Sequence, residues 1–431
     1  MSKRVKVHYK IETGNRRRLA VHGRDVAFWE PSAPDPPSPT GCYGIDPADV
    51  GPANSTAETS GTLATTSNIT SVLSAASPGD TILLRTGTYT GGETVPAGTA
   101  GNPITVKPYN KETVTITGNW TFNNYQTFDG LYWDSSGRGW TISINRNSSS
   151  SRHDLKWLYC DVRGGGTEGI RFAGNVTDVE IGYCKLWGGG NHTLKTHYKI
   201  GGSSTSWAPN DIHIHHCDIT HLGTPGRQRG DLVQFEGWGG NMILEHNYFH
   251  DEPLENAVDI KKPYSGGGGV FLIRWNLFDH DTISNAAFID HSGGITNNNS
   301  DTRWEDNYFP GSSSGAVATF GGDSEQNGYS KFVRNLIPDA PGRIVWWNQT
   351  NAVFSNNYIG PASMEMDNSG GSRPVTGLVM DENRFDGTDL NARTANYSGV
   401  NNEKNSVTGG TDWNPIGSGT ADYPSLDANP C

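Results

Sequence analysis

The chain has 431 residues, a formal net charge of −12 and a charged-residue content of only 18%. Gly occurs 55 times, Trp 13 times and Tyr 16 times, a profile that favours short strands and tight turns over helices. The negative charge excludes a general nucleic-acid binder, because binding phosphates needs a basic field, although an acidic protein can still carry a local basic patch.

The first 50 residues differ in composition from the rest. Residues 1–19 are basic, and the Pro-rich stretch "WEPSAPDPPSPT" follows at residues 29–40. This composition predicts a small attachment segment with a semi-rigid linker; an arm packed on the rest of the chain is the alternative. The basic start lacks an apolar core, so we expect no secretory signal, and no apolar run approaches the roughly 18 residues of a membrane span.

A capping helix is predicted next. Residues 67–76 have amphipathic spacing, with Ser67 or Asn68 as the helix cap. The "PGD" at residues 78–80 then predicts a turn into the strand "TILL". A helix in this position would cover the exposed edge of a sheet.

A short β-rich motif recurs from residue 157 to residue 385. It consists of a β-branched or aromatic run, a small residue and a second apolar pair, as in "WLYCDV", "LEHNYF" and "FSNNYI". The small residues are Cys160, Cys184, Cys217, Asn247, Asn276, Asn307, Asn335, Asn357 and Asn383. Their spacings run from 22 to 33 residues, a quasi-period varied by loop insertion that is typical of a solenoid. Gly130 in "FDGLYW" extends the series by one step.

The repeated segments are too short for the amphipathic helices of a helical solenoid, and their composition indicates strands. In a parallel stack, neighbouring coils lie about 4.8 Å apart, so equivalent residues form columns. Asn suits a corner because it tolerates a left-handed backbone and its amide can bond from coil to coil, and Cys in the same column is interpreted as a buried thiol. We therefore expect an all-β fold, a right-handed parallel β-helix (solenoid) with an N-terminal capping helix and an Asn/Cys ladder.

The predicted helix, "TYTGG" at 88–92 and "NPITVKPY" at 102–109 together resemble the opening of pectate-lyase-like β-helix proteins, over roughly residues 60–390. The resemblance implies the fold and leaves the chemistry open, because this fold hosts lyases, hydrolases, epimerases and adhesins. The basic, Pro-rich head resembles phage tail-associated depolymerases, which implies a virion-associated protein that acts extracellularly. We divide the chain into an arm and linker (1–50), a β-helix domain (51–390) and a closing segment (391–431), in which Cys431 is either free or tied to Cys42.

One face of the predicted β-helix concentrates polar side chains. With Val258 and Ile260 pointing inward, alternation places Asp259 and Lys261 outward. One predicted outward column reads Arg171, Lys195, Gln234, Asp259, Phe288, Ala318 and Val345. The next reads Ala173, His197, Glu236, Lys261, Asp290, Phe320 and Trp347. Charged loops beside an aromatic platform suit a sugar chain.

Eliminative cleavage of a uronate chain requires a neutralised substrate carboxylate and a base that removes the neighbouring proton. The segment "ENAVDIK" at 255–261 is similar to the "DDGWDLK"-like coil of the calcium-dependent β-helix pectate lyases. The resemblance implies a Ca²⁺ site and an acidic polysaccharide as substrate. The implied ligands are Glu255, Asn256 and Asp259, with Asp231 or Glu236 contributing from the preceding coil.

Lys261 is the candidate base, because the next coil offers Asp290 and His291 where that family has a lysine. Neighbouring carboxylates favour a protonated lysine and oppose this role, unless bound calcium occupies them. Without metal, His197, His250 or His291 is the better base, and Lys261 binds the sugar acid. Arg229 and Arg227 are the candidates for gripping the substrate carboxylate. The remaining candidates for binding the glycan are Lys195, His197, Lys262, His291, Phe320 and Trp347.

Three alternatives stay open. An inverting glycoside hydrolase would use Glu236, Asp259 and Asp290, because coil and strand spacings put these carboxylates roughly 8–10 Å apart, near the ~6.5–9.5 Å of inverting enzymes. A non-catalytic glycan-binding adhesin would present the same face. In a purely structural interpretation, Glu236, Lys261 and Asp290 form a cross-coil salt-bridge ladder.

Overall fold

The structure is a computed structural model. It describes residues 16–21, 24–29, 42–134, 139–144, 151–188, 192–197, 209–220, 231–236, 239–250, 256–260, 269–279, 287–290, 301–309, 316–320, 329–337, 343–346, 352–360, 363–366, 376–381, 383–385, 389–392, 396–398, 403–404 and 429–430. Among these, no helix is long and apolar enough to cross a lipid bilayer.

The chain divides into two units, residues 1–42 and 43–431. The first contains an antiparallel hairpin of β1 (Arg16–Val21) and β2 (Arg24–Trp29). The second contains three long parallel sheets, whose strands run as far as Glu403–Lys404. A short two-stranded sheet joins β3 (Cys42–Tyr43) and β40 (Asn429–Pro430). Cys431 and the side chain of Cys42 lie outside the described part of the chain.

The longest sheet, called sheet I here, has 14 strands. They are β4 (Thr62–Ala64), β5 (Thr81–Leu84), β7 (Ile104–Pro108), β9 (Gln126–Asp129), β12 (Arg152–Leu158), β15 (Val176–Gly182), β18 (Asn210–His215), β21 (Met242–Glu245), β24 (Val270–Arg274), β27 (Asp301–Glu305), β29 (Tyr329–Val333), β32 (Val353–Ser355), β35 (Thr376–Asp381) and β38 (Asn396–Ser398).

Sheet II has eight strands and continues, through bridges at Tyr308, into four more. They are β6 (Gly87–Tyr89), β8 (Val114–Ile116), β10 (Tyr132–Asp134), β13 (Asp161–Arg163), β16 (Lys185–Trp187), β19 (Asp218–Thr220), β22 (Tyr248–His250) and β25 (Leu277–Asp279), then β30 (Leu336–Ile337), β33 (Tyr358–Ile359), β36 (Arg384–Phe385) and β39 (Glu403–Lys404).

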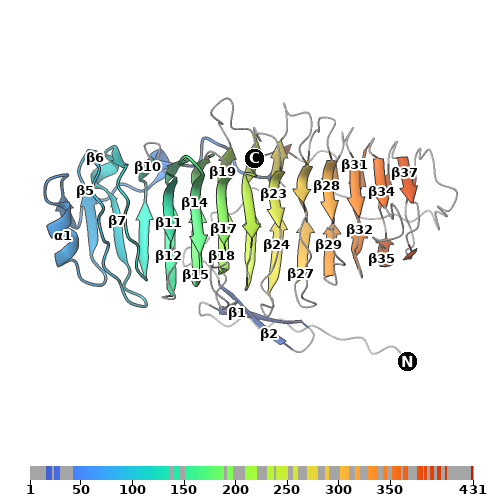
Figure 1. Cartoon of the computed structure of the whole chain (residues 1–431), viewed down its shortest axis with the longest axis horizontal. Coiled ribbons are helices and arrows are strands. Elements are labelled where there is room, and N and C mark those ends of the chain that lie inside the picture. The colour runs from blue at the N-terminus through green and yellow to red at the C-terminus, as the bar shows by residue number, and fades with distance from the viewer. Residues whose placement is uncertain are drawn as a thin grey trace. The chain divides into compact units, whose positions relative to one another are not determined.

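Sheet III has ten strands. They are β11 (Trp140–Ile144), β14 (Glu168–Ala173), β17 (His192–His197), β20 (Val233–Glu236), β23 (Asn256–Ile260), β26 (Ala287–Asp290), β28 (Ala316–Phe320), β31 (Arg343–Trp346), β34 (Ser363–Met366) and β37 (Asp389–Ala392). From β12 onward the chain visits sheets I, II and III in turn, and each strand pairs in parallel with its counterpart one coil away (Figure 1). The predicted parallel β-helix is confirmed.

The predicted capping helix is also confirmed. α1 (Ile69–Ala75) lies at one end of the stack beside β5 (Figure 1), and it buries Ile69 and Leu73 against the core. Asn68 occupies the cap position, but its Oδ1 accepts from the Thr65 amide at 2.7 Å and not from the helix. The predicted turn follows, with Gly79 at φ 94° leading into β5. Two short 3₁₀ helices are Pro52–Asn54 and Tyr109–Lys111.

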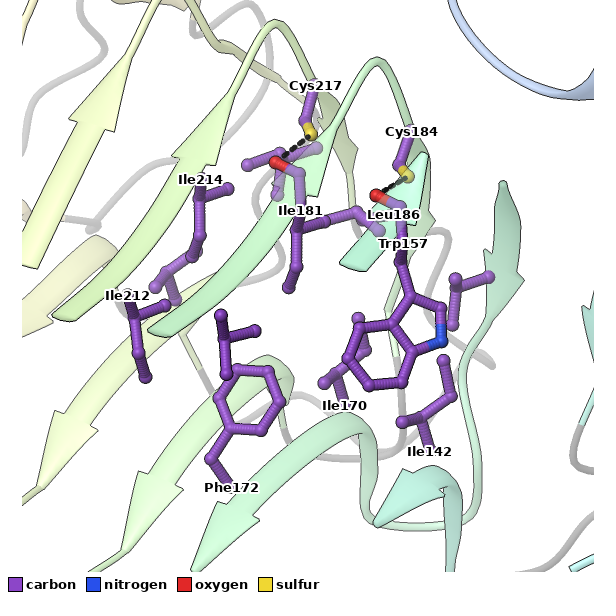
Figure 2. Close-up of a cluster of buried hydrophobic side chains, with 14 of the residues drawn as sticks. Ile142, Trp157, Ile170, Phe172, Ile181, Cys184, Leu186, Ile212, Ile214 and Cys217 are labelled. Carbon is purple, nitrogen blue, oxygen red and sulfur yellow. Dashed lines mark hydrogen bonds between the residues drawn. The ribbon is translucent and has the colours of Figure 1, made fainter. Parts of the chain in front are cut away.

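The core consists of inward columns of apolar side chains. Along sheet I, Phe128, Trp157, Ile181 and Ile214 occupy equivalent positions, and each is completely buried. The rings of Phe128 and Trp157 stack with centroids 5.4 Å apart. Figure 2 shows Trp157, Ile181 and Ile214 packed against Ile170 and Phe172, which come from the opposite wall of the coil on sheet III. Because each coil is only about 4.8 Å from the next, the columns form one continuous core.

The corner between sheets I and II contains the predicted Asn/Cys ladder. The backbone amide of Asn247 donates to Asn276 Oδ1 at 2.9 Å, and that of Asn276 donates to Asn307 Oδ1 at 3.1 Å. The Asn276 Nδ2 also donates to the Leu244 carbonyl at 3.0 Å. In the earlier coils the thiols take this role, and Cys184 and Cys217 each donate to a carbonyl of the preceding coil (Figure 2). The ladder satisfies polar groups that the tight corner would otherwise bury unpaired.

The prediction that Asn takes the left-handed conformation at this corner is wrong, because the left-handed residue is the one before each Asn or Cys. These residues are Gly130, Tyr159, Tyr183, His216, His246, Trp275, Asp306, Arg334 and Asn356, all with φ between 49° and 71°. Gly130 therefore belongs to this column, one position before the ladder. Five of the rings stack from coil to coil with centroids 4.7–5.0 Å apart, which offsets the cost of about 1 kcal/mol that each non-Gly residue pays for this conformation.

Residues 43–58 run across several coils near the same corner. The Gly44 amide donates to the Trp275 carbonyl and the Gly51 amide to the Tyr183 carbonyl, both at 2.8 Å. Gly44 has φ 74°, and a Cβ there would lie 2.8 Å from the Cβ of Leu277, so the segment can approach the corner this closely only with glycine.

The outer face of sheet I carries ion pairs between neighbouring coils. They are Lys107 with Asp129 at 2.8 Å, Lys156 with Glu180 at 2.8 Å, and Arg274 with Glu245 at 2.7 Å. On the intervening strand β18, His213 Nε2 lies 2.9 Å from Glu245, and His215 Nε2 lies 3.3 Å from Glu180. Positive and negative groups therefore alternate along the sheet, and the histidines separate two glutamates that would otherwise repel each other.

Replacing one ladder residue should destabilise the fold strongly. We expect Asn276→Ala to lower the free energy of unfolding by about 2–4 kcal/mol, because it leaves a buried amide and a buried carbonyl unpaired. Urea unfolding followed by circular dichroism measures this loss. Asn276→Cys should lose less, because Cys fills the same column at Cys184 and Cys217. The exposed Asn102→Ala is the matched control, and equal midpoints for it and Asn276→Ala would contradict the role of the ladder.

Acid should weaken the corner and sheet I. Burial would raise the pKa of Glu180, but the hydrogen bond to His215 and the charge of Lys156 outweigh it and lower the pKa from 4.5 to about 2. Burial, followed by the neighbouring His215, lowers the pKa of His216 from 6.5 to about 3. In both cases the unfolded chain takes up a proton at a higher pH than the folded chain. The stability contributed by His216 is therefore lost as the pH falls from 6.5 towards 3, and that contributed by Glu180 as the pH falls from 4.5 towards 2.

The thermal unfolding midpoint measured against pH tests this expectation. His216→Tyr keeps a ring in the stack between Tyr183 and His246 but removes the titrating group. We expect the variant to lose less stability than the wild type between pH 6.5 and 4.5, by on the order of 2 kcal/mol. Superimposable pH profiles for the two proteins would show that His216 does not contribute.

Candidate functional site

The strand register on sheet III defines which side chains share the candidate face. Arg171 pairs with Lys195, Lys195 with Gln234, and Gln234 with Asp259, as predicted. In the adjacent column Ala173 pairs with His197 and His197 with Glu236, also as predicted. Val258 and Ile260 are buried in the core, which leaves Asp259 on the outer side of β23.

Beyond β23 the predicted register is wrong. Asp290, not Phe288, pairs with Asp259, so β26 is displaced by two residues along the strand from its predicted alignment. Asp290 therefore lies in the Asp259 column and not beside Lys261. A two-residue slip keeps every residue on its face, which is why the hydrophobic alternation did not reveal it.

The register of β28 is displaced by one residue. Thr319 pairs with Asp290 and with Val345, and Phe320 pairs with Trp346. An irregularity between Ala316 and Ala318 accompanies this shift. Phe320 therefore falls at a position that alternates with the Asp259 column, which removes the basis for an aromatic platform made from it together with Trp347.

Three buried polar side chains meet at the centre of the face. The Nε2 of Gln234 donates to Asp231 Oδ2 and to Asp259 Oδ2, both at 2.8 Å. The three side chains are at most 2% exposed. Asp231 comes from the residues just before β20, Gln234 from β20 itself and Asp259 from β23. One amide thus bridges two carboxylates from adjacent coils.

The electrostatics of this cluster favour a cation. Gln234 donates one N–H to each of two buried carboxylates, and buried negative charge is stabilised by cations and by hydrogen-bond donors. The Oε1 of Gln234 is buried without a hydrogen-bond partner, and Asp290 occupies the next position of the column. Carboxylate and amide oxygens are the ligands that a hard cation such as Ca²⁺ prefers, so the cluster fits the predicted metal.

His250, a candidate base, lies on a different sheet from Asp259. It ends β22 on sheet II, where its Nε2 is 2.6 Å from Asp218 Oδ1 and its ring stacks on Tyr248. The Tyr248 hydroxyl in turn donates to Asp279 Oδ2 at 2.9 Å. β22 and β23 are successive strands of one coil, so His250 stands at the corner before the candidate face. A carboxylate on Nε2 makes an imidazole a stronger base.

Several predicted residues are placed only in part. For Glu236, Asp290, Lys195, His197, Asn256 and Phe320 the structure gives the strand position. Other predicted residues lie outside the described residues; they are Lys261, Lys262, Arg227, Arg229, Glu255, His291 and Trp347. Within the part of the chain that is described, no three His, Cys, Asp or Glu side chains form a metal-binding group by themselves. Gln234 completes the cluster and was not predicted as a site residue.

Among comparisons with known proteins, only the comparison with solved structures gives matches. The sequence matches no protein-family model, and no relative is found among curated proteins. A mutant of the alginate lyase AlyGC, of polysaccharide lyase family 6, superimposes with a TM-score of 0.50 at 14% identity, over 76% of this chain and 53% of that one.

Two further solved structures are similar. A mannuronic acid-specific lyase of polysaccharide family 6 from the human gut microbiota gives a TM-score of 0.43 at 13% identity, over 80% of this chain and 82% of that one. PfbA, a surface adhesin of Streptococcus pneumoniae, gives 0.43 at 12% identity, over 79% and 88%. At such identities the likeness concerns the fold alone, and the chain has the parallel β-helix fold that its sequence pattern predicts.

Proposed function

We propose that the protein is a polysaccharide lyase that cleaves an acidic, uronate-containing glycan by β-elimination. The observation that carries the proposal is the buried Asp231–Gln234–Asp259 cluster on the outer face of sheet III. A face with two bridged carboxylates and an unpaired amide oxygen is built to hold a cation, and a cation at this place can neutralise the carboxylate of a sugar acid. The structural likeness to an alginate lyase is consistent with this chemistry.

Elimination breaks two bonds of the substrate. A base removes the proton next to the sugar carboxylate, the electrons of that C–H bond form the new carbon–carbon double bond, and the glycosidic oxygen leaves with its bonding pair and takes a proton. The developing negative charge spreads onto the carboxylate, so positive charge there lowers the barrier. When bound, Ca²⁺ would supply that charge, held by Asp231, Asp259 and the Oε1 of Gln234.

Lys261 and His250 are our candidates for the base. Lys261 directly follows Ile260, the last residue of β23, and cation binding by Asp259 would remove a charge that favours its protonated form. His250 has its Nε2 against Asp218, which supports an imidazole that accepts a proton at its other nitrogen. Arg227 and Arg229 are proposed to grip the substrate carboxylate.

An inverting hydrolase is the second candidate function. The observed register of β26 reduces the number of carboxylate pairs that could serve it. Asp259 and Asp290 occupy adjacent positions, about 5 Å apart by strand spacing, which is shorter than the ~6.5–9.5 Å that an inverting pair needs. Glu236 and Asp290 are two coils apart and two residues out of register, roughly 12 Å, which is longer than that range. Only Asp259 with Glu236 keeps the separation expected of an inverting pair.

We also propose that residues 1–50 attach the protein to a larger particle such as a phage tail, and that it acts extracellularly. The support is the basic and Pro-rich sequence of this segment, which forms a unit apart from the β-helix as far as Cys42. A glycan-degrading β-helix on a particle would meet its substrate at a cell surface.

A panel of polyuronates and neutral glycans tests the main proposal. We expect new reducing ends together with the ultraviolet absorbance of an unsaturated uronate, and a loss of at least ~10²-fold for Asp259→Asn. Asp49→Asn is the matched control, because Asp49 is an exposed carboxylate outside the three sheets, and this variant should keep full activity. Reducing ends without absorbance would mean hydrolysis, and binding without either product would mean an adhesin.

Calcium binding can be tested by thermal unfolding, without measuring enzyme activity. We expect Ca²⁺ to raise the thermal unfolding midpoint of the wild type and EDTA to lower it, because the cation offsets the buried carboxylates. Gln234→Glu should be less stable than the wild type in EDTA and should gain more from Ca²⁺, whereas Gln234→Leu should respond less than the wild type. Identical midpoints in Ca²⁺ and EDTA for the wild type and Gln234→Glu would exclude a calcium site here.

A further inference from the structure

The Asp259 column changes sign along the β-helix axis. In register order the column runs from Asp290 and Asp259 on the C-terminal side through Gln234 to Lys195 and Arg171 on the N-terminal side. Each step is one coil, about 4.8 Å. Figure 1 shows β11, β14, β17 and β23 in this order along the stack, and β20 lies between β17 and β23 in the sheet. The residue types therefore change from acidic to basic along the column.

Arg171 is held on the outer face by its neighbours. Ile170 and Phe172 on either side of it in β14 are buried in the core, so Arg171 points away from the core and is half-buried. Its guanidinium carbon lies 5.2 Å from the ring centroid of Trp140 on β11. A guanidinium stacked on a ring loses less conformational freedom when it binds an anion, and its fork of N–H groups matches a carboxylate.

We propose that Arg171 forms a subsite for a second uronate carboxylate of the same glycan. This inference rests on the proposed function. The glycan would lie along the β-helix axis, with the sugar that is cleaved near Asp259 and the bound uronate towards β14.

The spacing gives the length of glycan that the subsite requires. Arg171 and Asp259 are three coils apart, about 14 Å. One pyranose unit in an extended chain is about as long as one coil is tall, so Arg171 meets a uronate about three sugars away from the one at Asp259. Short oligouronates cannot reach both places, whereas longer ones can. Arg171 is thus a specificity-determining residue for chain length and for charge.

The alternative role of Arg171 is packing against Trp140, and matched variants separate the two. Arg171→Met keeps a long apolar side chain over the ring but removes the charge, and Arg171→Lys keeps a charge but loses the fork. Arg85→Met is the control, because Arg85 is an exposed arginine that pairs with Glu112 and is not part of sheet III. Circular dichroism and the unfolding midpoint establish that each variant is folded.

The experiment measures the binding of purified oligouronates of two to six sugars, and of neutral oligosaccharides of the same lengths, by titration calorimetry together with KM values. We expect Arg171→Met to weaken the longest oligouronates by roughly tenfold, with a loss that grows with chain length, and Arg171→Lys to recover part of that affinity. Arg85→Met should match the wild type throughout.

The outcomes distinguish this inference from the proposed function. If the wild type binds and cleaves uronates, and Arg171→Met equals it at every length, the subsite is overturned and the lyase proposal stands. An equal loss for short and long oligouronates would also overturn the subsite, because it would indicate a general effect on the fold. If the wild type binds no uronate, both proposals fall.

Discussion

The structure depends on the corner between sheets I and II, where each coil hydrogen-bonds to the next through one small residue. Asn276 illustrates the arrangement, because its amide and its backbone bond to the coils on both sides at about 3 Å. A tight corner buries peptide groups that water cannot reach, so these bonds are needed for the chain to turn there. Thiols perform the same task more weakly in the earlier coils, with sulfur–oxygen distances of 3.4 and 3.6 Å between coils. Once the corners are aligned, the strand residues on either side of them pair in columns, as in β18 and β19.

The columns of charged residues on sheets I and III are arranged differently. On sheet I, cations and carboxylates alternate between neighbouring coils, so each charge finds a partner and the face is a stabilising one, sensitive to acid through Glu180 and His216. On sheet III, acidic residues follow each other in register at Asp259 and Asp290, and basic residues do so at Arg171 and Lys195. The buried bridge from Gln234 to Asp231 and Asp259 lies between these two pairs. This arrangement is the reason for placing the proposed function on sheet III.

The same geometry is the basis for proposing a linear polymer as the ligand. Strands repeat about every 4.8 Å along the axis, so a face of the β-helix presents equivalent positions at nearly constant intervals. An extended glycan presents its own groups at similar intervals. Under the proposed function, a cation at Asp231 and Asp259 and a guanidinium at Arg171 would contact different sugars of a single chain.

The sequence by itself determined the architecture of the β-helix. The Asn and Cys spacing located the corners, the alternation of Val258, Asp259 and Ile260 assigned inner and outer faces, and the cap at Asn68 located the helix at the end. These features could be predicted because they depend on residues near each other in the chain. The columns from Arg171 to Asp259 were also predicted correctly, since the strands there have clear apolar positions.

Only the tertiary structure decided how the later coils align and which polar groups meet. Loops of varying length separate β23, β26 and β28, so the hydrophobic pattern could not distinguish Asp290 from Phe288 as the partner of Asp259. The bridge from Gln234 to Asp231 and Asp259 spans two coils, and no local pattern encodes which amide lies between which carboxylates. Likewise, the left-handed residue proved to be Tyr183 or His216 and not the ladder residue, because stacking between coils stabilises a conformation that local preference disfavours.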